Sequence, residues 1–599
     1  MCGINGILRL ASDAPPPDRE ELRNTREAMA SRGPDGTGEW LSPHGDLALG
    51  HRRLAILDLT PSGAQPMSTP DGRFTVVYNG EIYNHRELRC ELEAAGVAFR
   101  TASDTEVLLQ LAAREGLAGI GRLRGMYAFA LWDEVEKSLL LARDPFGIKP
   151  LYYTAERGTL RFASQVKALT AGGAVRERID PAALAAFLLW GSVPEPRTIQ
   201  VGVRAVPAGH AVRVAGGRVG EPERIPIAAL GESLLPAEAL AASVAAHLVS
   251  DVPLAIFLSS GIDSCLVAAL ARRAATELLV EPPVAFTAAF EGWEGQARDE
   301  APLAREVARK LGLRHVERRL GRRDVALLWG SALAAMDQPS IDGFNTFLVA
   351  WLAHEEGIKV ALSGLGGDEL CGSYPSFADV PRWAHGAARL ASLPGVAATW
   401  PSLARRLRPA QPKLAGLLAQ GPSLPGAYYL RRGLFLPEEL RALLGPETAS
   451  AALEQIAPVA LAASRLAEPR PDGGRAADDW TSVQALEVSL YLRHQLLRDS
   501  DWAAMASSVE LRVPFVDVAL WSSFAARGFE PARSRGKAAL ARTVAPELPA
   551  AVFTRPKTGF QVLGPEAAGR PLTWGASSRQ LAIEVLRAWN VDLPTPEAA

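Results

Sequence analysis

Cys2 is the side chain with the clearest chemical potential, because it directly follows the initiator Met. Removal of that Met leaves one residue with a nucleophilic thiol and, within reach of it, an α-amine that can accept the thiol proton. An α-amino group titrates at about 7.7–8.0, so it can act as the base near neutral pH, directly or through a water molecule. An isolated Cys at position two is usually accidental, so this assignment depends on its surroundings.

A second stretch with chemical potential is FLSSGIDS at 257–264, which follows an apolar run and precedes a helical pattern at 265–274. Small residues let backbone N–H groups and hydroxyls approach phosphate oxygens, and a helix N-terminus favours negative charge. The GxxxxGK[ST] spacing is missing, which argues against a Walker A loop. Strand-glycine-helix turns are common, so this loop alone does not decide between a phosphate site and a plain turn.

A related stretch, SGLGGDEL at 363–370, ends another apolar run at 359–362. The runs at 253–258 and 359–362 are nearly continuously apolar, which is typical of parallel strands buried on both faces. Paired loops at the ends of such strands mark a ligand crevice. The second half of the chain is therefore predicted to be α/β, with its ligand between these two loops.

The elements that must position Cys2 are short β-rich runs punctuated by turns. They span 3–10, 47–57, 74–78, 127–132, 138–142 and 151–154. Helical periodicity is confined to stretches such as 19–30, 85–95 and 104–115. In these stretches apolar residues recur at three- and four-residue spacing. The pattern predicts packed sheets with helices over their faces.

Composition limits the classes of ligand. With 48% hydrophobic and 22% charged residues in 599, the chain is globular, and its length predicts several domains. Lys and Arg number 64 and Asp and Glu 66, so a formal net charge of -2 provides no field for nucleic acid or an anionic membrane. Four scattered cysteines argue against a disulfide scaffold or zinc site, and no signal peptide or membrane-spanning run is recognisable. We expect a cytoplasmic protein with small-molecule ligands.

Five ordered motifs follow Cys2. They are RGPDG at 32–36, HRRLAI at 51–56, YNGEIYN at 78–84, SDTE at 103–106 and RDPFGIKPL at 143–151. Together they resemble the glutaminase domain of the asparagine synthetase family, a class II glutamine amidotransferase with the N-terminal nucleophile hydrolase fold. The resemblance implies that Cys2 attacks the side-chain amide of glutamine and that Asn79 and Gly80 donate to the oxyanion. The residues implied to bind glutamine are Arg53, Asn79, Glu81 and Asp104.

Simpler interpretations exist for these residues. Asn79-Gly80 is also a common tight turn between strands, which is compatible with a role in the oxyanion hole. In the simpler interpretation, Arg53 and Asp104 form an ordinary surface ion pair. In the role that the resemblance implies, Arg53 neutralises the α-carboxylate of glutamine and Asp104 its α-ammonium, which would distinguish glutamine from other amides.

The two glycine-rich loops resemble the S-G-G-x-D-S and S-G-x-G-x-D-E segments of enzymes that split ATP into AMP and pyrophosphate. Ser260 stands where the first segment usually has Gly, and if this residue needs φ > 0 the substitution costs about 1 kcal/mol. The nucleotide-binding residues implied by the resemblance are Leu258, Ser259, Ser260, Gly261, Asp263, Ser264, Ala288, Ser363 and Gly364. Asp263 and Asp368 would hold Mg²⁺. Lys537, in RGK at 535–537, would contact the leaving pyrophosphate.

The resemblance continues in three later segments to which we assign no chemical role. These are DQPSIDG at 337–343, VELRVPFVD at 509–517 and RPKTGF at 555–560. Pro and Gly are frequent from 193 to 236, where we place the domain junction. Pro-broken helices at 383–476 carry no recognisable chemistry and favour a structural or lid role.

The predicted architecture combines α/β and α+β parts. An N-terminal nucleophile hydrolase sandwich (αββα) at 2–215 is followed by a linker at 216–234. A doubly wound parallel-sheet adenylating domain with helical additions then occupies 235–599. The predicted function is a glutamine-dependent amide ligase that uses ATP and Mg²⁺ and whose first candidate acceptor is aspartate, giving asparagine, AMP and pyrophosphate.

The residue at position 365 is Leu, and it leaves the identity of the acceptor carboxylate undecided. Many asparagine synthetases carry an acidic residue at this position, and an apolar side chain can neither accept a proton nor pair with an ammonium. The alternatives are the same chemistry on another carboxylate, such as a secondary metabolite, peptide or glycan precursor, a glutaminase alone, or a noncatalytic relative. A homodimer is compatible with the sequence.

Overall fold

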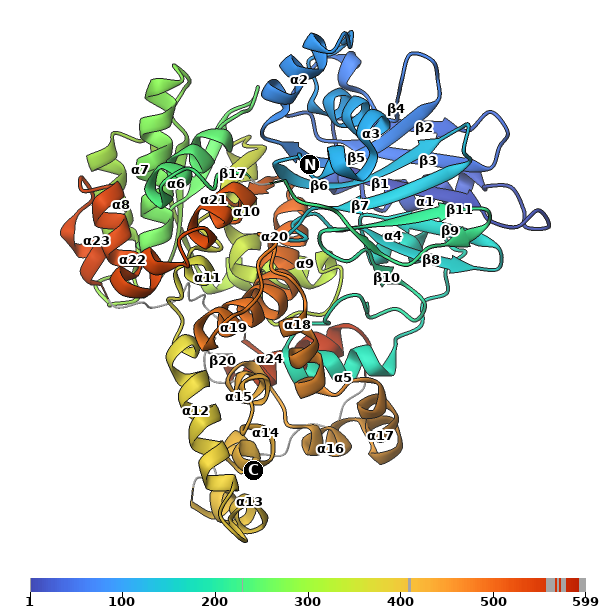
Figure 1. The fold of residues 1–599 in the computed structure, drawn as a ribbon. Coiled ribbons are helices and arrows are strands. Elements are labelled where there is room, and N and C mark those ends of the chain that lie inside the picture. The colour runs from blue at the N-terminus through green and yellow to red at the C-terminus, as the bar shows by residue number, and fades with distance from the viewer. Residues whose placement is uncertain are drawn as a thin grey trace.

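Two antiparallel sheets lie face to face in the N-terminal part of the computed structural model (Figure 1). The first has the strand order β10 (Arg204–Ala205), β8 (Tyr152–Glu156), β9 (Thr159–Ala163), β1 (Gly3–Arg9), β3 (Leu47–Arg53), β2 (Gly36–Leu41). The second has the order β12 (Arg218–Val219), β11 (His210–Ala215), β7 (Ser138–Arg143), β6 (Gly125–Asp133), β5 (Phe74–Ile82), β4 (Met67–Ser68). The structure describes residues 2–228, 230–407, 411–555, 566–567, 570–571 and 578–591.

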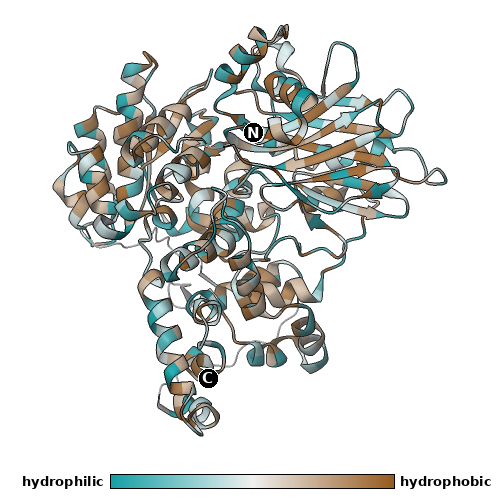
Figure 2. Ribbon diagram, in the orientation of Figure 1, coloured by the Kyte–Doolittle hydropathy of each residue, from teal (hydrophilic) through white to brown (hydrophobic). Residues whose placement is uncertain are grey.

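Alternation along the strands builds the layers of this sandwich, because successive side chains of a strand point to opposite faces. In β5, Val77 joins the core between the sheets, whereas Val76 and Tyr78 join the core on the outer face. Helices α2 (His85–Ala94) and α3 (Asp104–Ile120) cover that outer face, and α1 (Arg19–Glu27) and α4 (Val166–Ala171) cover the other sheet. Figure 2 shows apolar residues along the strands of this sandwich. The predicted αββα sandwich is confirmed.

The apolar run at 47–57 is strand only as far as Arg53. Leu54 and Ile56 are buried because they pack into a core shared with the second half of the chain, and not because the strand continues. Conversely, β5 continues beyond the predicted 74–78 to Ile82. Strands β2 and β9 were not predicted, since β2 reads Gly-Thr-Gly-Glu-Trp-Leu and lacks the apolar alternation on which strand prediction depends.

A parallel sheet forms the centre of the second half. Its order is β16 (His315–Leu320), β15 (Val284–Phe290), β14 (Leu254–Phe257), β17 (Val360–Leu362), β18 (Glu510–Arg512). Leu254 and Ile256 of β14 face a core that includes α7 (Ile262–Glu277), whereas Ala255 faces a core that includes α10 (Phe344–Glu355). Helices therefore cover both faces, which confirms the doubly wound prediction. The order reverses at β14, so the loops after β14 and β17 open at a topological switch point.

Residues 383–407 and 411–476 belong to a helical lobe below the parallel sheet in Figure 1. Its core includes Tyr428 and Tyr429 of α15 (Leu424–Arg432). Helix α5 (Pro181–Trp190) lies inside the predicted first domain at 2–215, but its Phe187 and Leu188 pack into this same core. The two halves of the chain are thus joined by more than the linker. No described helix is both long and apolar enough to cross a membrane.

The interface between the sandwich and the parallel sheet is buried and carries paired charges. Arg32 is fully buried and its guanidinium lies 2.7 Å from the carboxylate of Asp501. Leu54 and Met126 from the sandwich share one apolar core with Leu258 and Val513 from the second domain. Buried ion pairs of this kind hold one relative orientation, because separating them leaves charges without partners.

Candidate active site

Cys2 directly precedes strand β1 and is buried beside the side chain of Asn79. The Cys2 backbone nitrogen donates to Asn79 Oδ1 at 3.0 Å, and burial raises the pKa of the thiol. The Nδ2 donor of Asn79 is also buried and has no acceptor among the described residues. An unused amide donor beside a cysteine is available to an oxyanion that forms there.

Gly80 follows Asn79 in β5 and lies close to the neighbouring strand. A Cβ atom at this position would lie 2.1 Å from the carbonyl oxygen of Met126, so no side chain fits. Cys2, Gly80, Arg53, Glu81 and Asp104 line one common pocket. The structure therefore brings together the residues predicted for glutamine hydrolysis.

Arg53 and Asp104 are each held in the pocket by hydrogen bonds to other residues. Arg53 donates to the carbonyl oxygen of Thr60 at 2.9 Å, which helps to fix the guanidinium. Asp104 is buried at the start of α3 and accepts from Tyr78 Oη at 2.9 Å and from the Ile82 N–H at 3.1 Å. Burial raises the pKa of Asp104. Because Asp104 is buried and both residues have these other partners, the simpler interpretation of Arg53 and Asp104 as an ordinary surface ion pair does not apply.

Glu510 also lines the pocket that contains Cys2, although it belongs to β18 (Glu510–Arg512) of the second domain. Burial opposes ionisation of this carboxyl, but nearby positive charges, Arg512 among them, lower its pKa to about 2. Glu510 lies in the motif at 509–517, from which no chemical role was predicted. Its place in the pocket depends on how the two domains pack, which local sequence does not encode.

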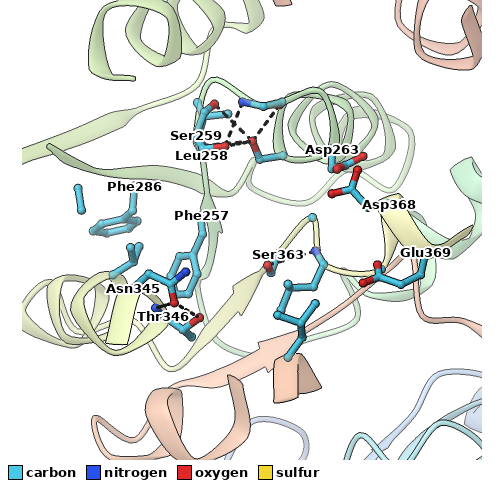
Figure 3. A pocket seen from close by; sticks show the side chains of 18 of the residues that line it. Phe257, Leu258, Ser259, Asp263, Phe286, Asn345, Thr346, Ser363, Asp368 and Glu369 are labelled. Carbon is cyan, nitrogen blue, oxygen red and sulfur yellow. Dashed lines mark hydrogen bonds between the residues drawn. The ribbon is translucent and has the colours of Figure 1, made fainter. Parts of the chain in front are cut away.

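The second pocket, of about 250 Å³, lies where β14 and β17 end (Figure 3). Its lining includes eight of the nine predicted nucleotide-binding residues: Leu258, Ser259, Gly261, Asp263, Ser264, Ala288, Ser363 and Gly364. Ser264 Oγ accepts from the Ser259 N–H at 3.1 Å, and Ser259 Oγ accepts from the Gly261 N–H at 3.1 Å. Side-chain hydroxyls thus shape the turn that leads into α7.

Ser260 is the predicted residue that does not line this pocket; it is buried beside it. Its backbone does not adopt a positive φ, so the steric cost considered for a Gly-to-Ser replacement does not arise. At Gly364 a Cβ atom would lie 2.8 Å from Cβ of Asp263. The close approach of the two loops therefore needs glycine at 364 and not at 260.

Asp263 and Asp368 face one another from the first turns of α7 and α11 (Gly367–Cys371), the helices that follow the two loops (Figure 3). The ammonium of Lys537 bridges them, with its Nζ 2.7 Å from Asp263 Oδ2 and also in contact with Asp368 Oδ1. Burial lowers the pKa of Lys537, but the two carboxylates outweigh burial and raise it. Gly536, directly before Lys537, interrupts helix α22 (Glu530–Val544) with φ 67°, a conformation that favours glycine.

The paired carboxylates fit a divalent cation, since they already converge on one positive charge. Mg²⁺ takes one or two carboxylates together with phosphate oxygens and water, and a full cage of protein ligands is not required. No cluster of three or more acidic, His or Cys ligands occurs among the described residues. Asp263 and Asp368 would therefore hold the ion only together with the nucleotide.

Several pocket residues were not predicted. Glu369 is buried and its pKa is raised to about 8, chiefly by burial and then by Asp368. Tyr374 Oη donates to Glu369 Oε1 at 2.9 Å, and Leu496 supplies apolar surface together with Leu365, the residue that the sequence had already singled out. The Arg555–Phe560 motif lies outside the described residues beyond Arg555.

Comparison with known proteins finds a family model for each of the two parts of the chain that carry these pockets. Residues 1–223 match the family model of a glutamine amidotransferase domain, and residues 236–589 match that of asparagine synthase. The second match alone covers more than half of the chain. The chain belongs to the glutamine-hydrolysing asparagine synthetase family. It is accordingly a ligase of the asparagine synthetase type.

Relatives of this asparagine synthetase family member span nearly its whole length. A putative glutamine-hydrolyzing asparagine synthetase of Mycobacterium tuberculosis is 31% identical over 596 residues, which is 94% of this chain and 87% of the relative. Asparagine synthetase 1 of Bacillus subtilis is 31% identical over 582 residues, with the same two coverages. A protein named amidase chry2 of Gibberella zeae is 32% identical over 63% of this chain and 60% of its own length.

Proposed function

We propose that the enzyme hydrolyses glutamine at Cys2 and transfers the ammonia to a carboxylate that ATP has adenylated. Aspartate is the first candidate acceptor, and the products are then asparagine, AMP, pyrophosphate and glutamate. The observation that carries the proposal is that one fold holds both pockets, with Glu510 of the ATP-binding domain lining the glutamine pocket. The glutaminase is therefore built against the domain that would use its product.

Glutamine hydrolysis would use the first residue of the mature chain as both nucleophile and base. The Cys2 nitrogen already donates to Asn79 Oδ1, so this contact would orient the α-amine toward its own thiol. Burial keeps the thiol protonated until the amine accepts the proton during attack on the amide carbon. Asn79 Nδ2 and the Gly80 N–H would then stabilise the tetrahedral oxyanion. Loss of ammonia leaves a glutamyl thioester, which water hydrolyses to glutamate.

Adenylation would take place between the two glycine-rich loops. The acceptor carboxylate attacks the α-phosphorus of ATP, and pyrophosphate leaves. Bound Mg²⁺ would neutralise phosphate charge, held by Asp263 and Asp368. Lys537 would move from these carboxylates to the pyrophosphate oxygens, on which negative charge develops.

Ammonia would pass from one pocket to the other through the protein. Free ammonia in solvent is mostly protonated near neutral pH and is then no nucleophile. Leu54 of the first pocket and Leu258 of the second belong to one buried apolar core, which also contains Met126 and Val513. An apolar interior favours the neutral form over ammonium, and neutral ammonia can displace AMP from the adenylate to form the amide.

A second acceptor class is supported by Leu365, which lines the ATP pocket. With Leu496 it presents apolar surface beside Glu369 and Tyr374. Such surface suits an acceptor with a larger apolar part than aspartate has.

AMP release tests the proposal and separates the two acceptor classes. Wild type and Leu365→Glu are given ATP, Mg²⁺ and a panel of carboxylic acids that includes aspartate, each with glutamine or with ammonium. Aspartate-dependent AMP release by the wild type supports asparagine synthesis, whereas aspartate use only by the variant supports another acid. Cys2→Ala is the control and is expected to respond to ammonium alone. Failure of every acid with both nitrogen sources would contradict the ligase.

A further inference from the structure

Arg512 is a fully buried residue that the mechanism above does not use. It ends β18, and its guanidinium has four acceptors within hydrogen-bond distance. Nε donates to Glu510 Oε1 at 2.7 Å and Nη2 to Glu81 Oε2 at 3.0 Å. Nη1 donates to the carbonyl oxygens of His247 at 2.9 Å and Val249 at 2.6 Å. A planar guanidinium with this many partners is held in one orientation.

The side chain of Arg512 reaches the glutamine pocket. Glu81 directly follows Asn79 and Gly80 in β5, and both Glu81 and Glu510 line the pocket with Cys2. Loss of the Arg512 contact would leave Glu81 buried without its ion-pair partner. A shift of the strand at Glu81 displaces Gly80, and misplacement of a reacting group by about 1 Å can cost about 100-fold in rate.

The backbone of the same residue reaches the ATP pocket. The N–H of Ser363 donates to the carbonyl oxygen of Arg512 at 2.9 Å, immediately after Leu362 of β17 pairs with Arg512. Ser363 and Gly364 line the ATP pocket. One residue is thus bonded through its main chain to the nucleotide loop and through its side chain to the glutamine pocket.

We propose that Arg512 is a positioning residue that couples the two pockets. ATP bound against the Ser363 loop fixes the end of β18, and the Arg512 guanidinium thereby fixes Glu81 and the adjacent oxyanion donors. The inference rests on the proposed function, since it requires glutamine in one pocket and ATP in the other. Coupling between binding sites is reciprocal, so glutamine must strengthen ATP binding by the same factor.

Binding to the Cys2→Ala protein tests this coupling without turnover. The dissociation constant of glutamine is measured with and without a nonhydrolysable ATP analogue and Mg²⁺, and the reciprocal experiment uses the analogue as the titrant. We expect the analogue to tighten glutamine binding by about fivefold or more, within the usual range of coupling factors. In Cys2→Ala/Arg512→Met this ratio is expected to fall to about one, since the side-chain link is lost.

Arg124→Met provides the matched control. Arg124 Nε lies 2.8 Å from Asp517 Oδ2, so this ion pair crosses the same domain interface, but neither residue lines either pocket. Cys2→Ala/Arg124→Met is expected to keep the ratio of the Cys2→Ala parent. A ratio of one in the Cys2→Ala parent, a full ratio in Arg512→Met, or equal loss in Arg124→Met would each overturn the inference.

Two further variants keep the test decisive if Arg512→Met does not fold. Arg512→Lys keeps the charge but cannot reach four acceptors at once, and Glu81→Gln weakens the same link from the other end. Both are expected to lower the ratio, and the parent's full ratio in both would refute the role of Arg512. Absence of glutamine binding under every condition would contradict the proposed function itself, whereas binding of both ligands without coupling would contradict this inference alone.

Discussion

Asn79 offers the sharpest test of the glutaminase mechanism, because its side chain has two separate tasks. Oδ1 accepts the Cys2 N–H at 3.0 Å, and the buried Nδ2 has no acceptor among the described residues. Asn79→Ala removes both groups. Asn79→Asp keeps an acceptor oxygen for Cys2 but replaces the donor with a second oxygen. The pair of variants therefore separates orientation of Cys2 from stabilisation of the oxyanion.

The expected loss is set by the missing oxyanion donor. Removing one such donor typically lowers kcat by about 10²–10³-fold, or about 2.7–4 kcal/mol. We expect a loss of this size in kcat for glutamate release in both variants, because neither can donate to the oxyanion. AMP release with ammonium in place of glutamine is the folding control and should stay near the wild-type rate. The carboxylate introduced by Asn79→Asp repels the oxyanion, so this variant should be no faster than Asn79→Ala.

The result that would refute this reasoning is a recovery of activity in Asn79→Asp. Glutamate release near the wild-type rate in that variant would show that Asn79 acts only by holding Cys2. A rise in KM for glutamine without a change in kcat, in either variant, would assign Asn79 to ground-state binding and not to the transition state.

Three further predictions concern the second domain and the interface. Lys537→Met should lower AMP release by about 100-fold or more while glutamate release persists, and equal loss of both activities would contradict a role confined to pyrophosphate. Burial raises the pKa of Glu369 from 4.5 to about 8, so across that window the native state holds a proton that the unfolded state has released. The free energy of unfolding should therefore fall by about 1.4 kcal/mol per pH unit as pH rises through the window, and Glu369→Gln should flatten this slope in urea titrations. Arg32→Met removes the nearer of two cations beside the buried carboxylate of Asp501 and leaves only Lys149, whose Nζ lies 3.9 Å from Asp501 Oδ1. The substitution should cost about 3 kcal/mol of unfolding free energy, whereas an unchanged denaturation midpoint would show that Lys149 or water compensates the charge.

Much of the glutamine pocket could be predicted because its chemistry is concentrated in short motifs. Asn79 and Gly80 are adjacent in one strand, and Arg53 and Asp104 each lie in a motif of their own. The same holds for the ATP pocket, where glycines permit the approach of two loops and carboxylates follow them directly. Ser260 shows the limit of a motif, since the departure from glycine at this position strains nothing.

The contribution of the second domain to the glutamine pocket could not be predicted. Glu510 and Arg512 lie more than 400 residues from Glu81, and their contact depends on how the two domains pack. The run after Arg53 shows the same limitation. Leu54 and Ile56 suggest a longer strand, yet they are apolar because the second domain covers them. Local periodicity records that a residue is buried, but not which part of the chain buries it.

In the proposed reaction, ammonia released at Cys2 reaches the adenylated acceptor without entering the solvent. The most direct measurement supplies glutamine with a heavy nitrogen isotope in its amide, together with an excess of unlabelled ammonium, and determines the isotope in the amide product by mass spectrometry. Internal transfer predicts a product that carries the label of glutamine, with little dilution. A product whose label matches the mixed ammonium pool would contradict the account, because it would show that the two pockets exchange ammonia through the solvent.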